Sequence, residues 1–165
     1  MEVSREHAIR SGEGERVDIF GLGVRFLLDG RMTKERFSIV EHPLAARALN
    51  APVHTHRNED EYTYVIEGRI GIQLGDEVLE AGAGDLVLKP RGIPHAFWNA
   101  GDEPARVLEV ISPAGFENYF REMAPLVAAG PPDEAAVAAV VARYGLEMDR
   151  SSIPVLVRRY GLRLG

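Results

Sequence analysis

Short apolar segments separated by turn-forming residues recur from residue 17 to residue 111. The segments are rich in β-branched, leucine and aromatic side chains, which fit a pleated and partly buried strand. They cover residues 17–20, 24–28, 37–42, 62–67, 70–74, 78–80, 86–89, 95–99 and 106–111. Turn pairs such as Asp29-Gly30, Gly75-Asp76 and Gly101-Asp102 lie between them. Many short strands without intervening helices predict an all-β sandwich or barrel.

The pattern changes to helical spacing after the turn at 112–115. Apolar residues at 116, 120, 123 and 127 predict a helix that Pro125 ends or kinks, because proline lacks a backbone N–H. A second helix is predicted between Asp133, in its first turn, and Gly145, just past its end. Its apolar stripe, which we expect to pack on the barrel, consists of Val137, Val140, Val141 and Tyr144.

The tetrapeptide Arg-Tyr-Gly-Leu occurs at 143–146 and again at 159–162, each time at the end of an apolar run. Glycine readily adopts the left-handed conformation that ends helices, and the leucine after it can pack back onto the last turn. Both copies therefore predict a helix end. We divide the chain into an N-terminal arm (1–16), a barrel (17–112) and a short C-terminal helical extension that packs on the barrel (113–165).

Composition and charge limit the classes of function. A chain of 165 residues can bury one core, and the absence of cysteine excludes disulfides, zinc-thiolate sites and iron–sulfur clusters. The net charge of −6 opposes nucleic-acid binding. The arginine-rich end (Arg150, Arg158, Arg159, Arg163) is interpreted as a solvated tail or as a helix that pairs with acidic surface of the same protein. No apolar run approaches the roughly 18 residues that span a membrane. We expect a cytoplasmic protein with neither nucleic-acid nor membrane partners.

Three of the five histidines, His54, His56 and His95, occur with Glu61 in strand-like sequence bracketed by glycine and proline. Side chains two residues apart on a strand point to the same face, so His54 and His56 are expected side by side. Imidazole nitrogens and one carboxylate suit a divalent transition metal such as Fe, Mn, Ni, Cu or Zn, whereas Ca and Mg prefer all-oxygen ligands. Two histidines are interpreted as surface or ordinary core residues, namely His7 and His42.

These residues resemble the two motifs of the cupin superfamily, G(X)5HXH(X)3-4E(X)6G and G(X)5PXG(X)2H(X)3N. The matching residues are His54, His56, Glu61 and Gly68 for the first motif and Gly84, Pro90, Gly92, His95 and Asn99 for the second. Ala48 stands where the first motif begins with glycine, a turn position that holds no ligand. The resemblance covers residues 17–112 and implies a double-stranded β-helix, or jelly-roll, barrel. It agrees with one divalent transition metal per barrel.

The alternation of side chains along a strand predicts which residues line the metal pocket. Thr63, Val65 and Phe97 share the inward face with the candidate ligands Glu61 and His95. Val65 and Phe97 are expected to form an apolar wall beside the metal, and Thr63 is a further candidate to contact substrate.

By the same alternation, Tyr62, Tyr64 and Trp98 point to the opposite face of their strands. We expect Trp98 to pack there under the C-terminal helices or at a subunit contact. Arg25, on an early strand, is a further candidate to face the metal. The pattern gives no such position to the two lysines, Lys34 and Lys89. Asn99, four residues beyond His95, is expected to hold structure by hydrogen bonding rather than to bind metal.

Four protein ligands leave one or two positions on a metal open for water, dioxygen or a bidentate substrate. Among cupins this ligand set is similar to that of quercetinase-like dioxygenases, oxalate oxidase and decarboxylase, and some isomerases. The resemblance implies a metal-dependent oxidoreductase of dioxygenase type acting on a small organic substrate, in which Glu61 can also accept a substrate proton. Two alternatives stay open: a non-catalytic metal or small-molecule sensor, and a sugar-type isomerase with a lysine or arginine in its pocket.

The predicted edge strands near the N-terminus bear on assembly. An edge strand leaves backbone N–H and C=O groups unpaired, which invites pairing with another chain. Cupins commonly cover such strands by dimerising, so the resemblance implies a homodimer.

Overall fold

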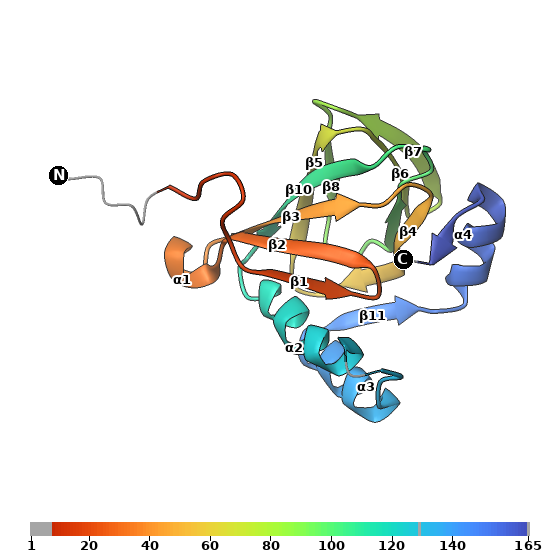
Figure 1. The fold of residues 1–165 in the computed structure, drawn as a ribbon. Helices are drawn as coiled ribbons and strands as arrows, with labels where there is room; N and C mark the ends of the chain where they lie inside the picture. Colours follow the sequence, from red (N-terminus) through yellow and green to blue (C-terminus); the bar gives the residue numbers. More distant parts are fainter. Residues whose placement is uncertain (1–7, 129, 165) are drawn as a thin grey trace.

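Two β-sheets enclose the core of the chain, with helices concentrated at its C-terminal end (Figure 1). The computed structural model describes residues 8–128 and 130–164, so the interpretation of His7 lies outside the described residues. The first sheet has the order β1-β2-β3-β10-β5-β8. Its strands are β1 (Arg16–Ile19), β2 (Leu22–Leu28), β3 (Ser38–Leu44), β10 (Ala105–Ser112), β5 (Asp60–Glu67) and β8 (Leu86–Lys89).

The second sheet has the order β11-β4-β9-β6-β7, and β12 pairs in parallel with β4. Its strands are β11 (Leu146–Asp149), β4 (Ala48–His56), β9 (His95–Trp98), β6 (Arg69–Leu74) and β7 (Glu77–Gly82), with β12 at Arg163–Leu164. None of the apolar segments predicted from the sequence overlaps β4, because Asn50 and Pro52 interrupt its apolar pattern. The two facing sheets confirm the predicted all-β jelly-roll fold.

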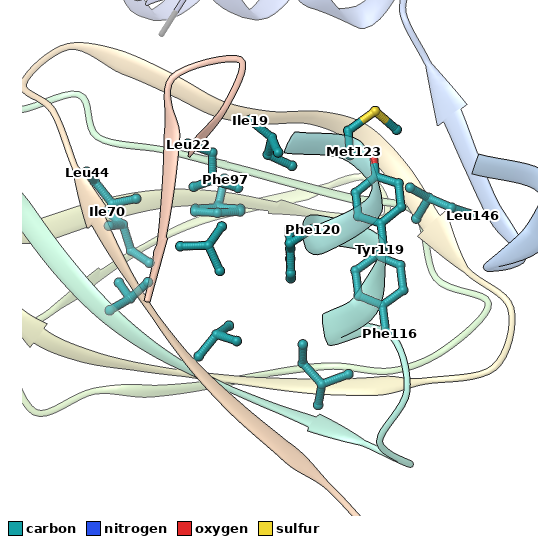
Figure 2. Packing of buried hydrophobic residues seen from close by; sticks show 14 of the residues in the cluster. Ile19, Leu22, Leu44, Ile70, Phe97, Phe116, Tyr119, Phe120, Met123 and Leu146 are labelled. Carbon is teal, nitrogen blue, oxygen red and sulfur yellow. The ribbon is translucent and has the colours of Figure 1, made fainter. Parts of the chain in front are cut away.

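Alternation along the strands builds the core. In β10, Ala105, Val107, Glu109 and Ile111 are buried while the residues between them are partly exposed. Such alternation turns one face of a strand inward. Tyr119, Phe120 and Met123 of the first helix after the barrel join this core, as does Phe116 immediately before that helix. Figure 2 shows these side chains together with strand residues such as Ile19, Leu22, Phe97 and Leu146.

The helices are α1 (Gly30–Thr33), α2 (Glu117–Ala128), α3 (Glu134–Arg143) and α4 (Ser152–Tyr160). Pro125 was predicted to end or to kink the helix, and α2 continues through it, so the proline does not end the helix there. Pro125 lies in the last turn of the helix, where its missing N–H removes one backbone hydrogen bond and leaves the preceding turns intact.

Both copies of Arg-Tyr-Gly-Leu end a helix, which confirms that prediction. Asp133 caps the start of α3 by accepting a hydrogen bond from the Ala135 N–H at 2.9 Å. Gly145, after α3, and Gly161, after α4, have φ values of +61° and +64°. This left-handed conformation costs glycine little, which is why glycine fits both positions.

The C-terminal extension also adds strand β11 to the barrel, which the sequence patterns did not predict. Leu146 and Met148 of β11 lie opposite His56 and His54 of β4, so the extension covers the edge of the strand that carries both histidines. Helix α4 packs against the same sheet, where Tyr160 stacks on Trp98 with ring centroids 4.3 Å apart. Trp98 therefore packs under a C-terminal helix, one of its two expected positions.

Among the described residues, no helix is both long and apolar enough to cross a membrane.

Candidate metal centre

Three strands bring the predicted ligands together. His54 and His56 lie near the end of β4, Glu61 lies at the start of β5, and His95 begins β9. Strands β4 and β9 pair with His54 opposite His95, which places these two imidazoles on the same inner face. One ligand atom from each of the four side chains lies within 4.8 Å of the others, and all four side chains are buried.

The size of this cluster fits one divalent transition metal. Metal–nitrogen bonds of about 2.0–2.1 Å put two donors on opposite sides of an ion about 4.2 Å apart. Neighbouring donors lie closer than this, so small inward shifts of side chains that already lie within 4.8 Å of one another would let all four bond one ion. His54, His56, Glu61 and His95 could together hold such a metal.

Backbone carbonyls fix the orientation of two of the imidazoles. The Nδ1 atom of His54 lies 2.8 Å from the Pro52 carbonyl oxygen, and that of His95 lies 3.0 Å from the Ile93 carbonyl oxygen. With the hydrogen on Nδ1, each ring donates to the carbonyl and directs the lone pair of Nε2 into the cluster. Both rings are therefore held in the form that coordinates a metal.

A buried carboxylate lies behind the third imidazole. The Nδ1 atom of His56 is 3.5 Å from Oε2 of Glu59, and neither atom has a hydrogen-bond partner among the described residues. A carboxylate behind a metal-binding histidine fixes the ring and raises its basicity. Sequence reasoning missed Glu59, although an acidic residue three positions after His56 was a visible signal.

Lys89 enters the site from β8, a position that the sequence pattern did not assign to it. Its Nζ lies 2.8 Å from Oε2 of Glu61 and 3.1 Å from Oε2 of Glu109. Strand β8 pairs with β5 so that Lys89 lies opposite Glu61, and both side chains therefore project into the barrel. The Thr63 hydroxyl donates to Glu109, 3.0 Å from each carboxylate oxygen. The cluster thus includes an ammonium group that the strand pattern alone did not place.

Burial and neighbouring charges set the ionisation of the ligands. Burial lowers the pKa of His54 well below its usual value and also lowers that of His95, which keeps both rings neutral near pH 7. Burial alone would raise the pKa of Glu61, but His56, Lys89 and His95 together hold that pKa well below its usual range. His54 and His95 therefore offer neutral imidazoles and Glu61 an ionised carboxylate, the forms that bind metals.

Glu109, the second carboxylate that contacts Lys89, differs from Glu61 in the direction of its pKa shift. Burial raises the pKa of Glu109 to about 7, although Lys89 opposes this change. Burial disfavours the ammonium form of Lys89, yet Glu109 and Glu61 raise the lysine pKa above its ordinary value. Lys89 is therefore the fixed positive charge of this buried group.

The structure brings three of the four predicted substrate residues to the inner face. Thr63, Val65 and Phe97 are all buried, and the Phe97 ring lies 5.2 Å from Nζ of Lys89. Arg25 is not part of the site. Its guanidinium group pairs with Glu41 at 3.1 Å, on the outer face of the first sheet, because the side chains of β2 that point inward are those on either side of Arg25.

Two further residues border the inner site. Phe116, at the start of α2, packs edge-on against His56 with ring centroids 4.3 Å apart. His42 is a buried core residue, one of the two positions expected for it, with Nδ1 2.8 Å from the Gly23 carbonyl oxygen.

Asn99 accepts a hydrogen bond from the Gly101 N–H at 2.9 Å and donates one to the Glu103 carbonyl at 2.8 Å, which confirms its structural role.

Comparisons with known proteins agree with this fold and site. Residues 42–111 match the family model described as a cupin domain. The chain is 37% identical over 60 residues to polyketide synthase CurC of Streptomyces cyaneus, across 36% of this chain and 39% of that protein. It is 34% identical over 93 residues to quercetin 2,3-dioxygenase of Bacillus subtilis (strain 168), across 55% of this chain and 27% of that protein.

A solved structure from Thermotoga maritima, described as a predicted oxalate decarboxylase, has a TM-score of 0.57 and 23% sequence identity, with 64% of this chain and 97% of that chain covered. The match covers well under half the length of each of these two curated relatives. Identity of 23% to the solved structure shows a common fold. The matching family model and the double-stranded β-helix identify residues 42–111 as a cupin domain.

Proposed function

We propose that this cupin is a metal-dependent oxidoreductase of the dioxygenase type, acting on a small organic substrate that chelates the metal through neighbouring oxygens. The observation that carries the proposal is the buried set of three imidazoles and one carboxylate within 4.8 Å, with two rings already oriented by carbonyls. The similarity to quercetin 2,3-dioxygenase over 93 residues supports this class of reaction.

The residues have separate roles in this proposal. His54, His56, Glu61 and His95 hold one ion of Fe, Mn, Ni, Cu or Zn, and such an ion supplies an electrophilic centre with open positions for oxygen ligands. The Glu61 carboxylate, ionised at neutral pH, is also the nearest base for a proton of a hydroxyl-bearing substrate. Val65 and Phe97 form an apolar wall that excludes water from the site.

A non-catalytic sensor or storage protein is the second candidate. His56 and His95 are each only 1% exposed, so the donors are almost closed off from solvent. A closed set of donors suits retention of an ion, whereas catalysis requires an open path to the ion. An isomerase is the third candidate, since Lys89 supplies a cationic group inside the pocket, although Glu61 and Glu109 already engage its ammonium.

One experiment separates these three functions. The protein, prepared without a histidine tag, is analysed for bound metal and then reconstituted anaerobically with Fe(II), Mn(II), Ni(II) or Cu(II). Oxygen uptake is followed with flavonols, β-diketones and oxalate, and aldose–ketose interconversion is followed with sugar phosphates. Oxygen uptake with one metal and one substrate supports the dioxygenase, whereas stoichiometric metal without turnover of any substrate supports the binding protein.

We also propose a homodimer, and the outer face of β5 and β8 is the surface that supports it. Leu86 and Leu88 on β8 are 64% and 47% exposed, and Tyr64 on β5 is 42% exposed. Leu86 lies opposite Tyr64 and Leu88 opposite Tyr62, so the four form a continuous apolar surface at the end of the first sheet. Exposed apolar surface of this kind marks interaction sites. The N-terminal edge strand β1, from which we first expected dimerisation, has only four residues.

A further inference from the structure

Three buried charged side chains form a chain behind the candidate metal site: Glu61, Lys89 and Glu109. Each side chain is at most 6% exposed. A lysine is rarely buried unless anionic groups take up its charge. Here the Lys89 ammonium bridges Oε2 of Glu61 at 2.8 Å and Oε2 of Glu109 at 3.1 Å.

Lys89 divides the two oxygens of Glu61 between different partners. Oε2 receives the ammonium, at 2.8 Å, and also lies 3.1 Å from Nε2 of His95. Oε1 lies 3.4 Å from Nε2 of His56 and is not part of the contact with Lys89. Oε1 is therefore the oxygen of Glu61 that faces an imidazole nitrogen without also contacting Lys89.

Glu109 and Thr63 fix the position of the lysine. Both lie on the inner face of adjacent strands, β10 and β5, where Thr63 is the direct partner of Glu109. The Thr63 hydroxyl is 3.0 Å from both oxygens of Glu109, so the carboxylate that holds Lys89 is itself held. A side chain anchored in this way keeps a defined geometry without help from a metal.

We propose that Lys89 is a positioning residue that occupies Oε2 of Glu61, limits Glu61 to a single bond with the metal through Oε1, and so preserves an open position for a ligand. Glu109 and Thr63 hold Lys89 in place. The inference rests on the metal site of the proposed function and does not depend on which reaction that site performs.

The test replaces Lys89 and reads the coordination of a probe metal. Cobalt(II) is added to the metal-free wild type and to Lys89→Met, and the visible absorption per bound cobalt is recorded. Cobalt(II) absorbs visible light more weakly as its coordination number rises. Without the ammonium, both oxygens of Glu61 are free to bind, so we expect Lys89→Met to retain stoichiometric cobalt with weaker visible absorption.

Matched variants separate positioning from a general effect of charge or folding. Lys34→Met removes the other lysine, which is exposed, and should leave the cobalt spectrum unchanged. Glu109→Gln keeps both the shape of the side chain and the charge of Lys89 but weakens the anchor, so a smaller loss of absorption is expected. The double variant Lys89→Met with Glu109→Gln avoids an unpaired buried carboxylate and serves if the single variant fails to fold.

The outcomes distinguish this inference from the proposed function. A wild type that takes up no cobalt overturns both the metal site and the role of Lys89. A wild type that binds one cobalt per chain, with the same spectrum in Lys89→Met or the double variant, overturns the role of Lys89 alone. A loss of absorption confined to the Lys89 and Glu109 variants supports it.

Discussion

Lys89 and Glu61 lie opposite each other on β8 and β5, and their charged groups meet at 2.8 Å inside the barrel. This contact joins a candidate metal ligand to a second buried carboxylate, Glu109. The surroundings of the metal site are therefore charged on the side of β8, whereas Val65 and Phe97 provide apolar surface.

Replacing one imidazole should abolish metal binding. We expect His56→Ala to lose stoichiometric metal, because three donors remain and the ring that packs against Phe116 is removed. Thr55→Ala is the matched control, since Thr55 is the intervening residue on the same strand and is not among the candidate ligands. Elemental analysis of both variants measures the effect. Full metal content in His56→Ala would show that the ligand set is wrong.

The Glu59 carboxylate behind His56 should strengthen metal binding. Loss of a group that orients a metal-binding histidine typically weakens metal affinity about 10–100-fold, and we expect Glu59→Gln to fall in this range. Competition with a chelator of known affinity gives the dissociation constants. Asp60→Asn changes the neighbouring carboxylate, which pairs with Arg91 on the surface, and should have little effect. Equal affinities in the wild type and Glu59→Gln would remove Glu59 from the site.

His42 should contribute to acid sensitivity. Burial lowers its pKa from the ordinary 6.5 to about 4. The unfolded chain therefore binds a proton more readily than the folded chain between these values, so this contribution to stability is complete above pH 6.5 and is lost as the pH falls toward 4. The loss is roughly 3 kcal/mol, from about 1.4 kcal/mol per pKa unit.

The measurement is urea unfolding of metal-free protein at several pH values. His42→Gln is expected to be less stable at pH 7 but to lose less stability between pH 6.5 and 4 than the wild type. Parallel pH profiles for the two proteins would contradict the assignment of this acid sensitivity to His42.

The stack of Tyr160 on Trp98 should stabilise the attachment of α4. Tyr160→Ala is expected to cost about 1–2 kcal/mol, because aromatic stacking and apolar burial are both lost. Trp98 is the single tryptophan, so its fluorescence should shift to longer wavelength as water reaches the ring. Val155→Ala, at a residue of the same helix that is 58% exposed, provides the control. An unchanged emission spectrum in Tyr160→Ala would argue against this packing.

The apolar outer face of β5 and β8 should control assembly. We expect the wild type to be a dimer by light scattering and the double variant Leu86→Lys with Leu88→Lys to be a monomer, because charge on this surface opposes its burial. Val78→Lys changes an exposed apolar residue on the other sheet and should leave the dimer intact. A monomeric wild type, or a dimer that survives both lysines, would place the interface elsewhere or exclude it.

The sequence by itself determined the all-β class, the four candidate ligands and the helix ends. Ligand spacing is local information: His54 and His56 share a face because side chains alternate along any strand. Helix ends are equally local, since the φ values at Gly145 and Gly161 depend on glycine tolerating a left-handed conformation. Neither inference needed the partner strands.

The tertiary structure decided which face of β8 is inside. Alternation separates the strand into two faces, with Leu86 and Leu88 on one and Val87 and Lys89 on the other, but alternation alone does not say which face is buried. Pairing with β5 turns Val87 and Lys89 inward and leaves both leucines exposed. The register between strands distant in sequence sets this choice, because Lys89 can be buried only where Glu61 and Glu109 meet its charge. The same dependence on distant partners explains why Arg25, paired with Glu41, lies outside the site and why β11 was not foreseen.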